Sequence, residues 1–272
     1  MSNDSLSFPS LVQSQSVSKK LSKAFEKLSS GKRINSASDD AAGLAIASSL
    51  ESSIKSLAQA SRNISDSVSR LEIADGALSQ VSDITGRLGE LAAQAANGTL
   101  SDEQRGAIQT EYSQLTEEIG RIAQTTEFNG QAIFDGSTFT SQVGLDSGGN
   151  SRIAAEGVNL SQLAQGLTAQ NLGSQGGAQA ALDQIKSFAD SVSNARSSLG
   201  ASSTRLQRAR DINDVTRENA AAAESRIRDV DVAEETARLT SLRIRQDIDT
   251  AVNAQGKLSR ASVLSLLGGG KK

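Results

Sequence analysis

The 272 residues include no His, Cys or Trp, carry a formal charge of −3, and are only 3% aromatic. The missing residue types exclude a Ser-His-Asp triad, a His-ligated zinc site, a thiol nucleophile and a disulfide. The acidic balance argues against a general nucleic-acid-binding protein, which needs a basic face. Composition leaves a carboxylate- or Lys-based enzyme open as the alternative, but nothing else in the sequence supports one. We expect a non-enzymatic protein with no catalytic residues, cofactor or metal site.

The N-terminal sequence MSNDSLSFPS lacks the basic and apolar stretches of a secretory signal. No apolar run approaches the roughly 20 residues that span a bilayer. If the protein leaves the cell, we expect it to use another export route and not to insert into a membrane. The segment that follows, residues 11–28, has a weakly amphipathic helical pattern.

A long helical pattern runs from about Leu44 to Asn97. Its seam follows a 4-3-4-3 spacing in which seven of nine positions are apolar, which is typical of a coiled coil. The nine positions are Leu50, Ile54, Leu57, Ser61, Ile64, Val68, Leu71, Asp75 and Leu78. About 50 residues at roughly 1.5 Å each predict a rod about 80 Å long, too long for a compact globule.

A second helix is predicted to begin after Ser101, because Ser101 and Gln104 have the spacing of a capping box. The link 98–100 is short, so we expect this helix to fold back antiparallel on the first.

The centre, residues 127–177, holds ten of the 23 glycines. Residues 139–143 and 152–155 resemble short strands, and 146–150 resemble a hairpin turn between them. A disordered glycine-rich linker is the alternative interpretation.

Helical patterns resume over about 178–220 and 232–267. Neither end of the chain has an obvious core of its own, so each is the natural partner of the other. The predicted fold is mainly α: a long antiparallel helical coiled-coil bundle with a small β-hairpin region and paired N- and C-termini.

Several motifs then suggest a family. Residues 28–47 (LSSGKRINSASDDAAGLAIA), 90–97 (ELAAQAAN), 127–130 (EFNG), 223–233 (AESRIRDVDVA) and 261–267 (ASVLSLL) occur in this order. Together they resemble the conserved end regions of bacterial flagellins. The resemblance covers both ends and nearly the whole chain.

The resemblance implies a minimal subunit of two layers without outer domains. Residues 1–40 and 233–272 would form the inner D0 coiled coil and the spoke. Residues 41–126, 127–177 and 178–232 would form the D1 rod with its hairpin. The implied function is a structural subunit that polymerises into the flagellar filament for swimming. Export would use the flagellar type III system, with an export chaperone, a filament cap and hook-junction proteins as partners.

The resemblance also implies roles for particular residues. The spoke and its polymerisation contacts fall on Gly31, Arg33, Asn35, Asp39, Asp40 and Gly43, with the acids meeting a neighbour's base. Helix capping by Ser38 and Asp39 is the alternative. Packing in D0 is predicted for Leu11, Leu21, Phe25, Leu28, Leu239, Leu242, Ile248, Val252, Leu258, Val263 and Leu266.

Two further surfaces are candidates. Arg87, Leu91 and Glu111 align with an innate-receptor site of the family, although a solvated charged face with a packing Leu explains them equally well. Gly86 and Gly89 replace the residues usual there. Ser137, Thr138, Thr140, Ser141 and Ser147 are candidate O-glycosylation sites.

Two rival functions stay open. A hook-filament junction protein shares the end motifs. A chemoreceptor-like signalling bundle shares the Ala- and Gln-rich heptads, although the glycine-rich centre and the lack of a membrane anchor argue against it.

Overall fold

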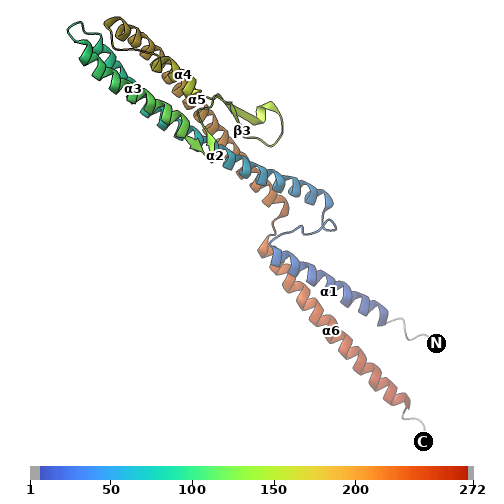
Figure 1. The fold of residues 1–272 in the computed structure, drawn as a ribbon. Coiled ribbons are helices and arrows are strands. Elements are labelled where there is room, and N and C mark those ends of the chain that lie inside the picture. The colour runs from blue at the N-terminus through green and yellow to red at the C-terminus, as the bar shows by residue number, and fades with distance from the viewer. Residues whose placement is uncertain (1–6, 269–272) are drawn as a thin grey trace. The chain divides into compact units, whose positions relative to one another are not determined.

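A computed structural model describes the fold of residues 7–268 (Figure 1), with side chains described for residues 12–256 and 258. The predicted packing residues Leu11, Val263 and Leu266 lie outside the described side chains.

The described chain is mainly helical, as predicted. The helices are α1 (Ser7–Ser30), α2 (Ala41–Ala95), α3 (Asp102–Thr125), α4 (Leu160–Thr168), α5 (Gln175–Arg228) and α6 (Val232–Gly268). Two small antiparallel pairs join β1 (Glu127–Phe128) to β2 (Gln131–Ala132) and β3 (Phe139–Gln142) to β4 (Arg152–Ala155).

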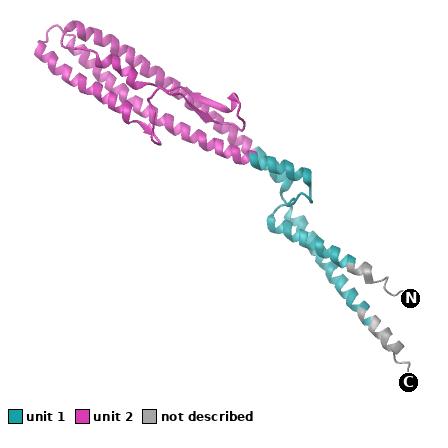
Figure 2. Cartoon of the chain, turned by 45° about the vertical axis from the view of Figure 1, so that its right-hand side comes forward, with its two compact units in different colours: residues 1–52, 219–272 teal, residues 53–218 magenta. Residues whose placement is uncertain are grey.

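The chain forms two compact units (Figure 2). Unit 1 comprises residues 1–52 and 219–272, and unit 2 comprises residues 53–218. The long helices α2 and α5 contribute residues to both.

Unit 2 is built around one apolar cluster of 30 buried residues from α2, α3, α4, α5 and the hairpin region. The predicted seam of α2 supplies Ile64, Leu71 and Leu78 to it. Asp75, a polar seam position, lies at an edge of this packing, where the Arg196 guanidinium of α5 pairs with it at 2.8 Å. The apolar periodicity of the long helices therefore does identify their buried faces.

The turn between α2 and α3 is fixed by local polar contacts. Ser101 caps α3 in the predicted capping box with Gln104. The Arg105 guanidinium is almost fully buried and donates to the carbonyls of Ala95 at 3.0 Å and Asn97 at 2.9 Å. Because the last carbonyls of a helix lack intrahelical donors, Arg105 satisfies the end of α2 from the first turn of α3.

The hairpin β3–β4 lies where the sequence predicts it, and its Gly149–Ser151 segment forms a single 3₁₀ turn. The Asn213 amide of α5 donates to the Val143 carbonyl at 2.8 Å, which fixes the end of β3 to the helix. The central region is thus an ordered part of unit 2, and the linker interpretation is wrong.

Two elements of the centre were not predicted. The β1–β2 pair turns at Asn129 and Gly130, which both have positive φ (52° and 72°), the requirement of a tight two-residue hairpin. Helix α4 is capped by Asn159. The buried Tyr112 hydroxyl of α3 donates to its Leu167 carbonyl at 3.2 Å.

In unit 1, α1 and α6 lie side by side (Figure 1), so the predicted pairing of the two ends is confirmed. Their shared core is small: Ala24, Leu239 and Leu242 are buried, with Leu21 and Leu28 partly buried against them.

Candidate assembly surface

The thin core of unit 1 leaves much apolar surface in water. Of the twelve large hydrophobic side chains that are exposed in the described part of the chain, eight belong to unit 1. They are Val12, Phe25, Ile46, Val232, Ile244, Ile248, Val252 and Leu258. Leu258 is 72% exposed and Val252 is 62% exposed. Exposed large apolar side chains concentrated in one unit of a protein point to a contact with another macromolecule.

The predicted packing residues of the ends therefore fall into two groups. Leu21, Leu28, Leu239 and Leu242 pack between α1 and α6. Phe25 is 43% exposed and carries the Arg243 guanidinium 5.1 Å from its ring centroid. Ile248, Val252 and Leu258 are more than half exposed among the described residues, so these side chains are available to pack against a partner.

The segment 31–40 connects α1 to α2 and is organised by Asp39. The Lys23 ammonium lies 2.9 Å from the Asp39 carboxylate, which also accepts from the Ser36 amide at 3.1 Å and from the Asn35 amide at 3.4 Å. Lys23 and Ser36 together hold the pKa of Asp39 well below its ordinary value. Asp39 is thus paired within its own chain, whereas the sequence suggested a neighbour's base.

Asp40, the next residue, caps α2. Its carboxylate accepts from the Gly43 amide at 2.8 Å, and its carbonyl accepts from the Leu44 amide at 3.0 Å. The interpretation of Ser38 and Asp39 as the caps is therefore wrong. A Cβ at position 43 would lie 2.5 Å from the Asp40 carboxylate and 2.8 Å from Ile34 Cδ1, which explains a glycine at this place.

The C-terminal end of α5 meets this connector inside unit 1. The Arg33 guanidinium donates to the Ile227 carbonyl and its amide to the Arg228 carbonyl, both at 2.6 Å. The Val230 amide donates to the Gly31 carbonyl at 3.0 Å, and Gly31 has a φ of +69°. Sequence reasoning did not predict this contact between segments almost 200 residues apart.

A groove of about 640 Å³ beside the connector is lined mostly by charged side chains from 23–40 and 229–238. Several of its carboxylates are already committed: Asp39 to Lys23, Asp40 to the start of α2, and Asp231 to the start of α6. The groove is therefore a polar surface in which these three carboxylates already have partners within unit 1.

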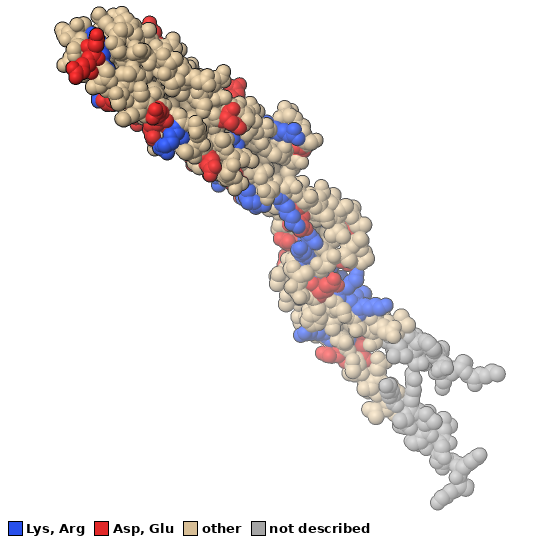
Figure 3. Space-filling view, in the orientation of Figure 1, with Lys and Arg blue, Asp and Glu red and all other residues tan. Residues whose placement is uncertain are grey.

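In the view of Figure 3 most of the visible face of unit 2 is uncharged, with isolated acidic and basic side chains. No broad basic field that would suit nucleic acid is visible on this face.

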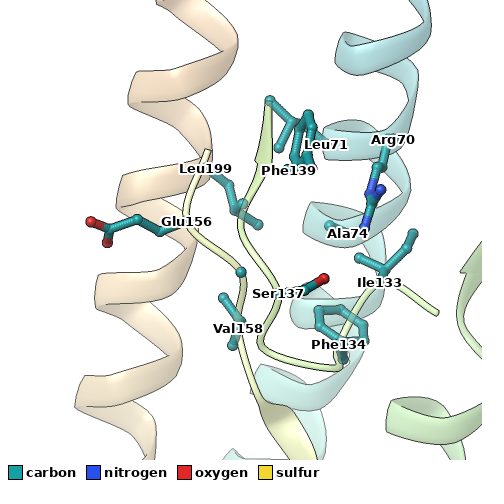
Figure 4. A pocket seen from close by; sticks show the side chains of 11 residues that line it. Arg70, Leu71, Ala74, Ile133, Phe134, Ser137, Phe139, Glu156, Val158 and Leu199 are labelled. Atoms are coloured by element: carbon teal, nitrogen blue, oxygen red, sulfur yellow. The ribbon is translucent and has the colours of Figure 1, made fainter. Parts of the chain in front are cut away.

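A small cavity in unit 2 (Figure 4) is too small for a cofactor. It has a volume of about 20 Å³, room for roughly one water molecule. The Arg70 guanidinium lies 4.7 Å from the centroid of the Phe139 ring at its rim, and Glu156 points away from it. The cavity is a packing gap between α2 and the central loops.

The candidate receptor residues lie on α2 and α3. The Arg87 guanidinium pairs with Glu111 at 2.7 Å and with Glu90 at 2.9 Å, and these carboxylates raise its pKa. Leu91 is 1% exposed and belongs to the core of unit 2. A receptor could reach Arg87 and Glu111, but not the Leu91 side chain, so Leu91 is wrongly included in that site.

The candidate glycosylation residues differ in their exposure to solvent. Ser137, Thr138, Thr140 and Ser147 are exposed. Ser141 is 4% exposed, because it shares the inward face of β3 with Phe139 and Val143, and its hydroxyl has no hydrogen-bond partner. A transferase could not reach Ser141, which is a correction to the predicted set.

Within the described residues, no cluster of acidic side chains could hold a metal ion. Among residues 7–268, no helix carries an apolar stretch long enough to cross a bilayer.

Comparison with known families agrees with this arrangement. Residues 7–138 match the family described as the bacterial flagellin N-terminal helical region. Residues 182–267 match the bacterial flagellin C-terminal helical region. The two matches include α1, most of α5 and nearly all of α6.

Two curated relatives match along most of their length. A flagellin of Halalkalibacterium halodurans is 43% identical over 90% of this chain and 91% of its own. A flagellar filament 30.7 kDa core protein of Treponema maltophilum is 38% identical over 89% of this chain and 90% of its own.

Solved structures share the architecture. The crystal structure of Bacillus cereus flagellin superposes with a TM-score of 0.51 over 56% of this chain and 88% of that one, and the two sequences are 28% identical. A putative flagellar hook-associated protein of Vibrio parahaemolyticus has a TM-score of 0.58 over 70% of this chain and 99% of that one, but only 16% identity, so it shares the fold alone. With two family regions matched and a relative 43% identical over nine-tenths of its length, the chain belongs to the bacterial flagellin family.

Proposed function

We propose that this chain is the structural subunit of an extracellular flagellar filament and that it works by self-assembly without catalysing a reaction. The observation that carries the proposal is the concentration of exposed apolar side chains in unit 1, which has almost no core of its own. Stacking many copies would remove that surface from water, at roughly 25 cal/mol for each Å² of apolar area.

The geometry of such an assembly follows from the surface. In this proposal copies stack head to tail along one direction, so each contact joins two different surfaces of the chain. Heterologous contacts that do not close produce filaments instead of rings. In this proposal unit 1 contains the inner D0 layer and the spoke, and unit 2 corresponds to the D1 rod.

Partners beyond other copies of the chain belong to the same proposal. Export through the flagellar type III system would involve a chaperone, and growth would occur between hook-junction proteins and a tip cap. An innate receptor would contact Arg87 and Glu111 only. Sugars would attach to the exposed hydroxyls of Ser137, Thr138, Thr140 or Ser147.

Seeded elongation tests the proposal. Purified full-length chain is added to sheared filament seeds, and growth is followed by negative-stain microscopy. We expect continuous elongation by the full chain and none by a version lacking residues 1–30 and 232–272, although that version keeps the helical signal of unit 2. Growth that stops after a few subunits would indicate a junction protein, and elongation by the trimmed chain would contradict the proposal.

A further inference from the structure

The last turn of α5 has an unusual cap. Helices commonly end with a glycine that returns the chain so that nearby amides satisfy the last carbonyls. Here Ile227 and Arg228 are the last two residues of α5. Both of their carbonyls accept hydrogen bonds from one residue, Arg33, which lies 194 positions before Ile227.

The contact extends to both sides of Arg33. Lys32 and Asp229 form an antiparallel bridge, and the Val230 amide donates to the Gly31 carbonyl at 3.0 Å. Arg228 in turn reaches from α5 to Glu51 of α2, with 3.0 Å between the charged atoms, and to Glu224 at 3.6 Å. Three segments of unit 1 are therefore linked in series: connector 31–40, the end of α5, and the start of α2.

Polar contacts dominate the conformation of this connector. Ile34, at 1% exposure, is the buried apolar side chain that it contributes. The connector needs acceptors on α5, and the end of α5 needs donors from the connector. Each segment therefore stabilises the other, and such coupling is reciprocal by thermodynamic necessity.

We infer that Arg33 and Arg228 are positioning residues that form a two-arginine clamp, through which the N-terminal connector and the C-terminal end of α5 become ordered together. A chain in which one of these segments is missing or misplaced leaves the other without its partners. The clamp thus makes the conformation of connector 31–40 conditional on segment 227–230 being in place. Its role in assembly rests on the proposed function, whereas the clamp itself does not.

The test is amide hydrogen exchange, read by mass spectrometry, on filaments of the full-length chain. The variants are Arg33→Ala, Arg33→Lys and Arg228→Ala. Arg226→Ala is the matched control, because Arg226 is exposed in the same last turn of α5. Segment 102–125, the α3 helix of unit 2, serves as the internal reference.

We expect Arg33→Ala to speed exchange of the Val230 amide and of the last turn of α5 by about tenfold or more, the effect of losing one charge-assisted hydrogen bond at a helix end. Arg228→Ala removes the ion pairs to Glu51 and Glu224 but keeps the carbonyl that accepts from Arg33, so it should speed exchange at the end of α5 and, through that segment, in 31–40. Arg33→Lys should restore part of the protection, because an ammonium can donate to one carbonyl. Arg226→Ala and the reference segment should not change.

The inference is overturned if Arg33→Ala affects only residues near position 33, or if Arg226→Ala has the same effect as Arg33→Ala. If the wild-type chain does not elongate seeds, the proposed function is wrong. The clamp is then tested by the same exchange comparison on the unassembled chain. An unprotected connector in both wild type and Arg33→Ala would then reject it.

Discussion

Unit 2 and unit 1 are both built mainly from long helices, but the helices of unit 2 bury many more apolar side chains. In unit 2, parts of α2 and α5 with α3, α4 and the hairpins surround 30 buried residues, whereas α1 and α6 share a cluster of three. Most of the exposed large hydrophobic side chains lie on α1 and α6. The difference indicates that unit 2 is stabilised by its own core and that unit 1 depends on contacts with other copies.

One leucine substitution in each unit tests this difference most directly. Leu78→Ala removes a fully buried side chain from unit 2 and should cost about 2–5 kcal/mol in the free energy of unfolding. Leu258→Ala removes one that is 72% exposed in unit 1 and should leave that energy within roughly 0.5 kcal/mol.

Seeded elongation should show the opposite order of effects. Leu258→Ala should raise the protein concentration needed for filament growth more than Leu78→Ala does. Thermal melts followed by circular dichroism supply the first measurement. Equal effects of the two substitutions on melting would contradict the division between the units.

A second test concerns the turn between α2 and α3. Arg105→Ala leaves the carbonyls of Ala95 and Asn97 without their buried donor, so we expect a loss of about 2–3 kcal/mol in the stability of unit 2. Arg121→Ala, on the same helix but with its side chain 60% exposed, is the control and should cost less than about 1 kcal/mol. Urea titrations of the two variants measure both values.

Alkaline pH provides a third test, again specific to unit 2. Burial raises the pKa of Tyr112 to about 12. The unfolded chain loses this proton near pH 10 while the folded chain keeps it, so stability should fall between pH 10 and 12. The contribution is roughly 1.4 kcal/mol for each pH unit. Tyr112→Phe should melt with a flatter dependence on pH in this range, and an unchanged slope would reject the assignment.

A fourth test exploits the unpaired hydroxyl in the hairpin. Ser141→Ala removes a buried oxygen that has no hydrogen-bond partner, so it should stabilise unit 2 by about 1 kcal/mol. Ser147→Ala changes an exposed hydroxyl and should have no measurable effect on the melting temperature. A loss of stability in Ser141→Ala would mean that the hydroxyl has a partner in solution.

The smallest expected effect is in unit 1. Because Lys23 and Ser36 lower the pKa of Asp39, its contribution to stability is complete above the ordinary value of 3.8 and decreases as pH falls from there through the lower folded value. Amide protection in 31–40, taken relative to the intrinsic exchange rate at each pH, should therefore persist at pH 4 and decrease in stronger acid. Asp39→Asn should exchange faster already at neutral pH; equal rates in the two proteins would reject the pairing.

Patterns repeated along the sequence predicted the fold well. Heptad spacing located the long helices and the buried face of α2, and the pair Ser101 and Gln104 marked the start of α3 correctly. The pairing of α1 with α6 followed from the lack of a core at either end. These features are local or periodic, so neighbouring residues contain the signal.

The remaining features depend on contacts that no short pattern encodes. Helix α4 has nine residues and β1 and β2 have two each, too few for a periodicity to emerge. Two adjacent acids precede α2, and only the fold distinguishes Asp40 as the cap from Asp39 as the partner of Lys23. The contact of Arg33 with the end of α5 joins residues with no fixed spacing.

Two errors had a signal that could have been used. Ser141 alternates with Phe139 and Val143, so the period of a strand already places it on the inward face. Leu91 continues the apolar face of α2 three residues after Leu88, so it belongs to the core.

The turn between β3 and β4 has a practical consequence. Residues 145–150 are all exposed, and the strands on either side are held by their ladder and by Asn213. Adding residues to a loop whose ends are already fixed costs only slowly increasing entropy. We therefore expect a peptide epitope inserted after Ser147 to be displayed without loss of unit 2, and a polymer of this chain would present it as a regular, repeating array.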